Sequence, residues 1–305
     1  MLDQTAKRAQ PRALSRRILP ATTLSLAGLA VAACSPLGML NGLAPRRLTA
    51  RDIPYGRDER QRLDIYAPEG LKRPAPVIVF LYGGGWDSGL KAMYRFVGGT
   101  MAAHGFVTVI PDYRLYPTVR YPTFLEDCAA AFAWSAANAR AWGGGETLFL
   151  MGHSAGAYNA AMLALDRRYL VCAGSRAQPA GTVGIAGPYD FLPLESVELR
   201  AIFGFPTSPA TQPINHVDGH NAPMLLLAGE SDTTVLPRNT TRLAARIRAA
   251  GGPVSDHLYP NIDHREIIGA IGQPFSFLAP TLPDTLAFLN ARVAAAGAST
   301  FGRAA

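Results

Sequence analysis

The stretch that most constrains this chain runs from Leu148 to Ala161 and reads LFLMGHSAGAYNAA. An apolar run typical of a buried strand meets Gly152-His153-Ser154-Ala155-Gly156, and an alanine-rich segment that favours a helix follows directly. In this G-x-S-x-G pattern the serine lies on a sharp turn, and a Cβ at either glycine would collide with neighbouring backbone. Taken alone, the pattern fits an ordinary strand-to-helix turn equally well. The partners of a nucleophilic serine therefore decide its meaning.

A glycine triplet lies at the end of an earlier predicted strand. Pro76 to Leu81 (PVIVFL) is a near-continuous β-branched and aromatic run, which is typical of a strand covered on both faces. It ends in Tyr82-Gly83-Gly84-Gly85-Trp86. Without side chains in the way, the main-chain N–H groups of Gly84 and Gly85 could donate to an oxyanion in a cleft. Taken alone, the triplet would be interpreted as a flexible loop.

The elements between these two motifs follow in a characteristic order. A helix is predicted over Met93 to His104, a strand over Phe106 to Ile110, and a helix from Tyr121-Pro122 to Trp142, with Asp-Tyr-Arg-Leu at residues 112–115. This order resembles the α/β-hydrolase fold. More narrowly, it is similar to the branch that includes hormone-sensitive-lipase-like carboxylesterases, feruloyl-esterase-like enzymes and kynurenine formamidases. The resemblance extends from about Tyr55 onward.

The resemblance implies an α/β domain with a mostly parallel central sheet and helices on both faces. Two positions depart from the pattern. Members usually carry His where Tyr82 stands, and the lipase-like subgroup usually has an acidic residue where His153 stands. The Tyr82 change leaves backbone donors intact, but the subgroup stays open.

A serine nucleophile needs a histidine base, a carboxylate that orients it, and donors for the oxyanion. The fold keeps its acid just beyond a strand end after the serine, and Pro223 to Leu227 is such a strand. Asp232 is favoured there over its rival Glu230, because its spacing to Gly229 and Val235 matches the family pattern. The chain order Ser, Asp, His then assigns the base to His264, ahead of the other histidines, which are His104, His153, His216, His220 and His257.

These residues predict a serine hydrolase that cleaves carboxylic esters of small to medium acyl or aryl groups. The catalytic residues would be Ser154, Asp232 and His264, with the N–H groups of Gly84, Gly85 and Ala155 as the oxyanion hole. We expect no cofactor and no metal. Two alternatives stay open: hydrolysis of an arylformamide, and a catalytically inactive, membrane-tethered binding protein on the same fold.

The N-terminus accounts for most of the basic character of the chain. The net charge is +7, and +4 of it lies before residue 34. We therefore expect no nucleic-acid partner. Ile18 to Ala33 is uncharged and apolar, so that residues 1–33 resemble a secretory signal peptide.

The junction Val31-Ala32-Ala33-Cys34 resembles the lipobox of bacterial lipoproteins. It implies an acylated Cys34 and a lipid-anchored protein in a bacterial cell envelope, at the outer membrane or facing the periplasm. An uncleaved signal anchor and simple secretion with Cys34 unmodified are the alternatives. We expect a linker over residues 34–51 and the catalytic domain over residues 52–305, while the oligomeric state stays open.

Cys128 and Cys172 are the other two cysteines, and both lie in apolar or alanine-rich contexts. A buried free thiol is the default interpretation of each. Their spacing does not decide whether they pair as a disulfide. Between them and Asp232, residues 192–220 form an irregular, proline-containing insert, which is a candidate lid or pocket wall with Phe191, Phe203 and Phe205 available to line it.

Overall fold

The computed structural model describes residues 36–301, so the predicted signal peptide and Cys34 lie outside the described residues. Its strands form one eight-stranded sheet in the order β1-β2-β4-β3-β5-β6-β7-β8. Only the pairs β1–β2 and β2–β4 are antiparallel, which confirms a mostly parallel sheet. The strands are β1 (Leu48–Pro54), β2 (Arg62–Tyr66), β3 (Ala75–Leu81), β4 (Val107–Pro111), β5 (Gly144–His153), β6 (Thr182–Ile185), β7 (Met224–Gly229) and β8 (Val254–Tyr259).

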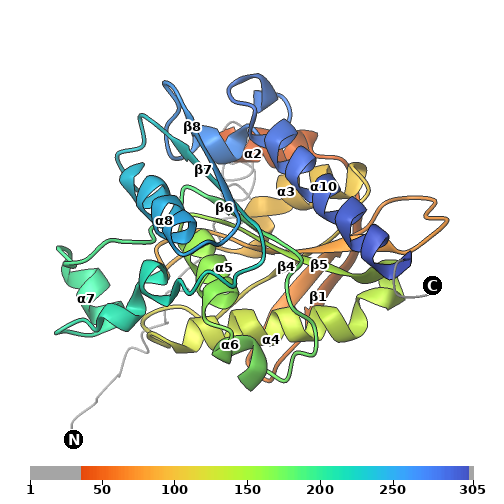
Figure 1. The fold of residues 1–305 in the computed structure, drawn as a ribbon. Coiled ribbons are helices and arrows are strands. Elements are labelled where there is room, and N and C mark those ends of the chain that lie inside the picture. The colour runs from red at the N-terminus through yellow and green to blue at the C-terminus, as the bar shows by residue number, and fades with distance from the viewer. Residues whose placement is uncertain (1–35, 302–305) are drawn as a thin grey trace, which may run out of the picture.

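Helices cover both faces of this sheet, as expected for an α/β-hydrolase fold (Figure 1). Helices α3 and α10 lie over one face, and α4, α5 and α8 lie over the other. The helices are α2 (Pro36–Leu43), α3 (Arg95–Ala103), α4 (Thr123–Asn138), α5 (Ala155–Leu165), α6 (Arg168–Cys172), α7 (Val197–Phe203), α8 (Arg238–Ala249), α9 (Glu266–Gly269) and α10 (Thr281–Phe301). Short 3₁₀ turns complete the set: η1 (Lys91–Tyr94), η2 (Ala139–Trp142), η3 (Pro209–Thr211), η4 (Pro213–His216) and η5 (Phe275–Phe277).

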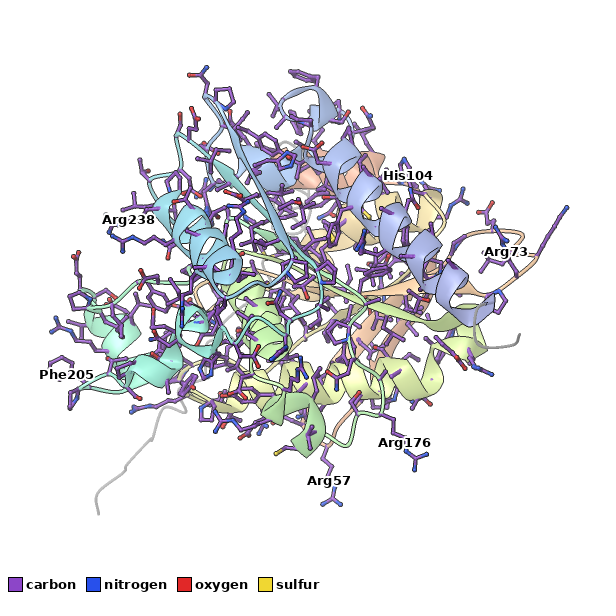
Figure 2. All side chains as sticks on the ribbon, viewed as in Figure 1. Arg57, Arg73, His104, Arg176, Phe205 and Arg238 are labelled. Atoms are coloured by element: carbon purple, nitrogen blue, oxygen red, sulfur yellow. The ribbon has the colours of Figure 1, made fainter. Side chains whose placement is uncertain are left out.

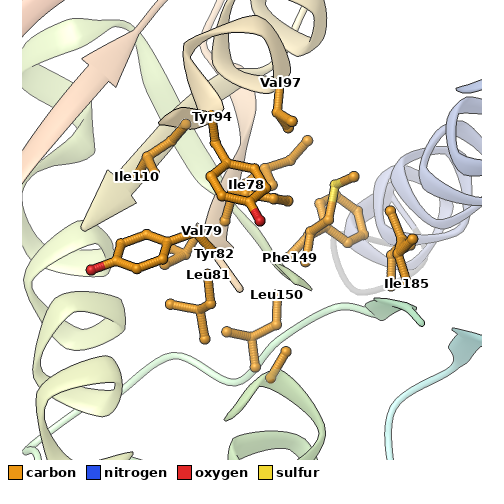
Figure 3. Close-up of a cluster of buried hydrophobic side chains, with 14 of the residues drawn as sticks. Ile78, Val79, Leu81, Tyr82, Tyr94, Val97, Ile110, Phe149, Leu150 and Ile185 are labelled. Carbon is orange, nitrogen blue, oxygen red and sulfur yellow. The ribbon is translucent and has the colours of Figure 1, made fainter. Parts of the chain in front are cut away.

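The core is centred on the parallel strands β3 and β5. Val79 of β3 is in register with Leu150 of β5 on one side and Val109 of β4 on the other, and all three are fully buried. Figure 3 shows how side chains of the strands, among them Ile78, meet side chains of the covering layer, among them Val97. Each fully buried aliphatic side chain of this kind contributes about 1.5–3 kcal/mol. This packing holds the strand ends that carry the site.

We expected a linker over residues 34–51, but the structure shows regular elements in the part of this range that it describes. They are α2 and most of β1, so that the ordered fold begins before Asp52. Leu40 of α2 is buried, and Asn41 donates to the carbonyl of Met93 and accepts from the N–H of Phe96. β1 shows mostly exposed residues, so it lacks the alternation that identifies a strand in sequence. β1 is the edge strand, and β2 beside it is an inner strand of the sheet.

A buried lysine ties this N-terminal part to the centre of the sheet. The ammonium of Lys91 contacts Asp52 (2.5 Å), Asp64 (3.2 Å) and Asp112 (3.7 Å), which lie on β1, on β2 and just after β4. The N–H of Lys91 also donates to the Asp112 carboxylate (2.7 Å). Burial raises the pKa of Asp112. These bonds fix η1, whose last residue is Tyr94.

The two cysteines of the described residues are free. Cys128 is buried, as expected, but Cys172 is exposed at the end of α6, so the expectation of a buried thiol is wrong there. The insert over residues 192–220 also holds more structure than its prolines indicate, because α7, η3 and η4 lie within it.

Candidate active site

Ser154 occupies the turn between β5 and α5 in a strained conformation. Its φ of 55° and ψ of −125° lie outside the regions that L-residues favour, at a cost of about 1–3 kcal/mol. The Ser154 N–H donates to the carbonyl of Ile185 (2.9 Å), which ties the turn to β6. A Cβ on Gly152 would lie 2.2 Å from the carbonyl oxygen of Gly156, and one on Gly156 would lie 2.0 Å from that of Leu81. Both glycines of the motif are therefore required by close backbone approach.

The structure brings Ser154, His264 and Asp232 together. His264 Nε2 lies 2.9 Å from Ser154 Oγ, and His264 Nδ1 lies 2.7 Å from Asp232 Oδ2. A carboxylate only accepts, so Nδ1 carries the proton and donates to Asp232. Nε2 is then free to accept from the serine hydroxyl. This is the relay that a nucleophile, a base and an orienting acid require.

The environment of Asp232 separates it from its rival. Its carboxylate is fully buried, and Oδ1 accepts from the N–H groups of Thr234 (2.9 Å) and Val235 (2.8 Å). Glu230 is exposed. The backbone N–H of Glu230 donates to the carbonyl of Tyr259, and within the described residues its carboxylate makes no hydrogen bond or ion pair with His264. The geometry therefore favours Asp232 as the partner of His264.

The loop that carries His264 is held by a reciprocal cap. The Asp263 carboxylate accepts from the N–H groups of Arg265 and Glu266 (both 2.8 Å). In return, the Glu266 carboxylate accepts from the N–H of Asp263 (2.9 Å). These reciprocal bonds close the turn directly before α9, in the manner of a capping box. Asp263 thus orients the backbone around His264 and not its imidazole.

The glycine-rich loop after β3 lies against the serine. A Cβ on Gly83 would lie 2.8 Å from Ser154 Cβ, and Gly85 lines the same cavity as Ser154 and Ala155. Gly84 (φ 135°) and Gly85 (φ 62°) adopt conformations that glycine alone takes readily. Within residues 36–301, the N–H groups of Gly84, Gly85 and Ala155 have no hydrogen-bond partner. They are available as donors, as an oxyanion hole requires.

Tyr82, which stands where related sequences usually carry His, is buried just before this loop. Its hydroxyl accepts from Arg60 (2.9 Å), and its ring stacks on Tyr113 with centroids 4.7 Å apart. The Tyr113 hydroxyl donates to the Tyr82 carbonyl (2.7 Å). The tyrosine therefore fixes the base of the loop without taking a donor from it.

A cavity of about 520 Å³ opens beside Ser154. Phe191 and Leu192 form part of its apolar wall, while Asp190 and Arg242 at its rim are paired (3.0 Å). The Trp86 ring stacks with Phe191, with centroids 6.2 Å apart, and meets Phe203 edge-on at 4.8 Å. A second hollow, of about 710 Å³, lies at the amino-terminal ends of β3 and β5, which are the strand ends away from Ser154. None of the predicted site residues lines it.

The insert supplies only part of the expected aromatic lining. Phe191 lines the cavity, and Phe203 packs behind it against Trp86. Phe205 is 72% exposed, lies at the periphery of the molecule (Figure 2), and has the Arg200 guanidinium over its ring. The expectation that Phe205 is available to line the pocket is therefore wrong, because the chain turns outward at Gly204 (φ 87°).

His153 lies within the elbow, which is the G-x-S-x-G turn over residues 152–156, and the sequence alone indicates no role for it. The structure buries its ring between Tyr94 and the backbone of His264. No spacing in the sequence indicates these contacts, since the partners are 59 and 111 residues away. Its place beside the serine was the only available signal.

No group of three or more His, Cys, Asp or Glu in the described part of the chain could hold a metal ion. Within residues 36–301, none of the helices combines the length and apolar character needed to span a bilayer.

Comparisons with known proteins agree with this architecture. Esterase LipC of Mycobacterium tuberculosis is 28% identical over 80% of this chain, and the match spans 66% of the length of LipC. Kynurenine formamidase of Salmo salar is 25% identical over 72% of the chain and 76% of that protein. The solved structure of esterase B from Lactobacillus rhamnosis superposes with a TM-score of 0.75 at 17% identity, over 91% of this chain and 97% of that one, a likeness of fold.

The BD-FAE family matches residues 63–247, which include the glycine-rich loop, the elbow and Asp232. This match covers more than half of the chain, and the protein therefore belongs to the BD-FAE family and has the α/β-hydrolase fold.

Proposed function

We propose that the protein is a carboxylesterase-type serine hydrolase that works through Ser154, His264 and Asp232. The hydrogen bonds of His264 to Ser154 (2.9 Å) and to Asp232 (2.7 Å) carry this proposal. The sequence similarity to esterase LipC supports it. Because the chain spans about two thirds of LipC, the activity of the whole protein rests on the site geometry and not on that relative alone.

The proposed reaction is a two-step acyl transfer. His264 takes the proton of Ser154 as the serine oxygen attacks the ester carbonyl, and Asp232 stabilises the imidazolium that forms. The oxyanion accepts hydrogen bonds from the N–H groups of Gly84, Gly85 and Ala155. His264 then returns its proton to the leaving alcohol. In the second step it activates a water that hydrolyses the acyl-enzyme. Side chains and backbone N–H groups of the protein thus supply the nucleophile, the base and the oxyanion donors of this reaction.

The cavity beside Ser154 supports a substrate with a small to medium acyl or aryl group. A volume of about 520 Å³ suits a small organic ester, and the Phe191 wall offers apolar contact. Hydrolysis of p-nitrophenyl acetate, butyrate, octanoate and laurate by the full chain, beside Ser154→Ala, tests the proposal. Wild type should cleave the short esters, and Ser154→Ala should retain only background, a loss of about 10⁶ in kcat. Equal rates for the two proteins would contradict it.

A formamide is the second candidate substrate, and similarity to the kynurenine formamidase of Salmo salar favours it. The same serine, base and oxyanion donors could attack an amide carbonyl. N-formylkynurenine should therefore be assayed in parallel with the esters. A kcat/KM for the formamide above that for every ester would replace the esterase proposal.

A catalytically inactive binding protein is the remaining alternative. Covalent labelling by a fluorophosphonate separates it from both enzymes, because only an activated serine reacts. Labelling of wild type but not of Ser154→Ala supports an enzyme. No labelling of either protein, together with no turnover of ester or formamide, supports a binding protein.

We also propose that the protein is lipid-anchored in a bacterial cell envelope through Cys34. The support is the sequence of residues 1–34, a basic start, an apolar segment and the junction Val31-Ala32-Ala33-Cys34. Membrane fractionation of cells that express the full chain tests this proposal. A protein found in the soluble fraction would support simple secretion.

A further inference from the structure

His153 joins two loops of the site through its two ring nitrogens. It ends β5, directly before Ser154, and is 5% exposed. Nδ1 lies 3.0 Å from the Tyr94 hydroxyl, and Nε2 lies 3.1 Å from the backbone carbonyl oxygen of His264. The Tyr94 hydroxyl in turn accepts from the N–H of Gly83 (3.3 Å). One imidazole thus connects the glycine-rich loop after β3 with the loop after β8.

The partners decide the direction of every bond in this chain. The carbonyl oxygen of His264 only accepts, so His153 Nε2 carries a proton and donates to it. In the neutral ring Nδ1 is then an acceptor, and the Tyr94 hydroxyl donates to it. That hydroxyl still has lone pairs for the N–H of Gly83. The hydrogen bonds therefore run in one direction from Gly83 to the backbone of His264.

The surroundings keep His153 in this neutral form. Burial, followed by the nearby imidazole of His264, lowers the pKa of His153 to about 3. Burial raises the pKa of Tyr94 to about 12, so its hydroxyl stays protonated as well. The two imidazole rings lie 4.9 Å apart. When His264 becomes an imidazolium during the reaction, His153 beside it adds no second positive charge.

We propose that His153 is a positioning residue, which as the neutral Nε2–H tautomer couples the glycine-rich loop at Gly83 to the loop that carries His264. The inference rests on the proposed function. Gly83 packs on Ser154 Cβ, and its neighbours Gly84 and Gly85 provide the oxyanion donors. The link therefore sets both the base and the oxyanion donors at fixed distances from the same serine oxygen.

Four substitutions divide the link into its separate bonds. His153→Ala removes both bonds of the ring. His153→Gln offers an amide N–H toward the carbonyl of His264 but no acceptor for Tyr94, and His153→Asn offers an acceptor for Tyr94 but no donor for the carbonyl. Tyr94→Phe keeps the His153 ring and removes the hydroxyl. Tyr158→Phe is the matched control, because Tyr158 is also buried and donates one bond to a backbone carbonyl, that of Thr211 (2.6 Å).

Each variant is assayed for kcat and KM with p-nitrophenyl butyrate, for the rate of fluorophosphonate labelling, and for its melting midpoint. His153→Ala should lose about 100-fold in kcat, because displacing reacting groups by about 1 Å costs that much. KM should stay within threefold, since the cavity walls are untouched. His153→Gln and His153→Asn each remove one bond of the ring and should lose about tenfold, the square root of that loss, and Tyr94→Phe, which removes the bonds to His153 and Gly83, should lose at least as much. Tyr158→Phe should keep the wild-type kcat.

A double-mutant cycle and a pH profile test the coupling itself. Tyr94→Phe and His153→Gln both break the bond between Tyr94 and His153, and Tyr94→Phe also breaks the bond from Gly83, so the double variant should lose no more kcat than Tyr94→Phe alone. The acidic limb of the kcat/KM pH profile should move in His153→Ala and stay in place in Tyr158→Phe. A purely structural role would lower the melting midpoint and leave this limb unchanged.

The outcomes separate this inference from the proposed function. If wild type neither hydrolyses esters nor reacts with the fluorophosphonate, the proposed function fails. If wild type is active and folded His153→Ala has the wild-type kcat and pH profile, only the coupling fails. If His153→Ala does not fold, Tyr94→Phe and His153→Gln decide. Additive losses in their double variant, or wild-type activity in both, overturn the proposal.

Discussion

Replacing Asp232 by Asn tests the relay with the smallest change in shape. The amide oxygen can still accept from the N–H groups of Thr234 and Val235, which now bind Oδ1. The amide N–H group then faces His264 Nδ1, where Asp232 Oδ2 accepts a hydrogen bond at 2.7 Å. His264 must therefore move its proton to Nε2. In that tautomer Nε2 donates toward Ser154 Oγ and cannot accept its proton.

The size of the loss follows from this tautomer change. An asparagine at the orienting position of such a relay lowers kcat by about 10⁴. This factor corresponds to about 5.4 kcal/mol in the activation free energy. The cost in stability should be smaller, about 1.5–3 kcal/mol, because one hydrogen bond to a charged group is lost. We expect kcat for p-nitrophenyl butyrate to fall by about 10⁴ in a protein that still unfolds cooperatively in urea.

Glu230→Gln is the matched control for this experiment. Glu230 lies two residues before Asp232, but it is exposed and, within residues 36–301, makes no hydrogen bond or ion pair with His264. We expect its kcat to equal that of wild type. If Asp232→Asn stays within tenfold of wild type while Glu230→Gln loses several orders of magnitude, the assignment of the acid is wrong. If neither variant loses activity, His264 does not depend on a carboxylate.

Three further predictions concern the elbow, the buried lysine and the N-terminus. Gly156→Ala should lower the free energy of unfolding, measured by urea denaturation, by about 3 kcal/mol or more, because the new Cβ would lie 2.0 Å from a backbone oxygen. Gly42→Ala is the control: Gly42 has open space around it, so the free energy of unfolding should change by at most about 1 kcal/mol. Lys91→Met should cost about 3–5 kcal/mol at pH 7, since it leaves buried carboxylates unpaired. The raised pKa of Asp112 means that its carboxyl binds a proton more readily in the folded state than in the unfolded state. The stability lost in Lys91→Met should therefore shrink as the pH falls toward 4. A loss that does not depend on pH would contradict the role of the carboxylates. Cys34→Ser should abolish incorporation of a clickable fatty acid and release the protein from the membrane fraction, and an unchanged label would exclude Cys34 as its site.

The parts of the fold that the sequence predicted are those with strong local signals. The β3 run over Pro76–Leu81 and the β5 run before Ser154 are continuous and apolar because both strands are buried on both faces. Their glycine-rich ends mark places where backbone approaches backbone. Asp232 and His264 were found by their order and by strand ends, and the structure brings both to Ser154.

The parts that the sequence did not predict depend on contacts between distant segments. β1 pairs with β2 through its backbone and leaves most of its side chains exposed, so no apolar pattern marks it. α2 attaches through Leu40 and Asn41, and neither residue identifies a helix alone. The place of His153 between Tyr94 and the backbone of His264 arises only when β5 and the loop after β8 meet.

Three of the non-glycine residues with positive φ follow the strands around the site. Trp86 (φ 65°), Ser154 (φ 55°) and Ala186 (φ 50°) follow the neighbouring parallel strands β3, β5 and β6, and each costs about 1–3 kcal/mol. Hydrogen bonds across these ends hold all three, because Trp86 accepts from the N–H of Tyr116 (2.8 Å), Ser154 donates to Ile185 (2.9 Å) and Ala186 donates to Leu227 (2.7 Å). A single strained turn could relax by moving its neighbours. Three turns that share one row of strand ends cannot relax separately, and a Ser154 hydroxyl fixed in this way needs no rearrangement before it meets the base.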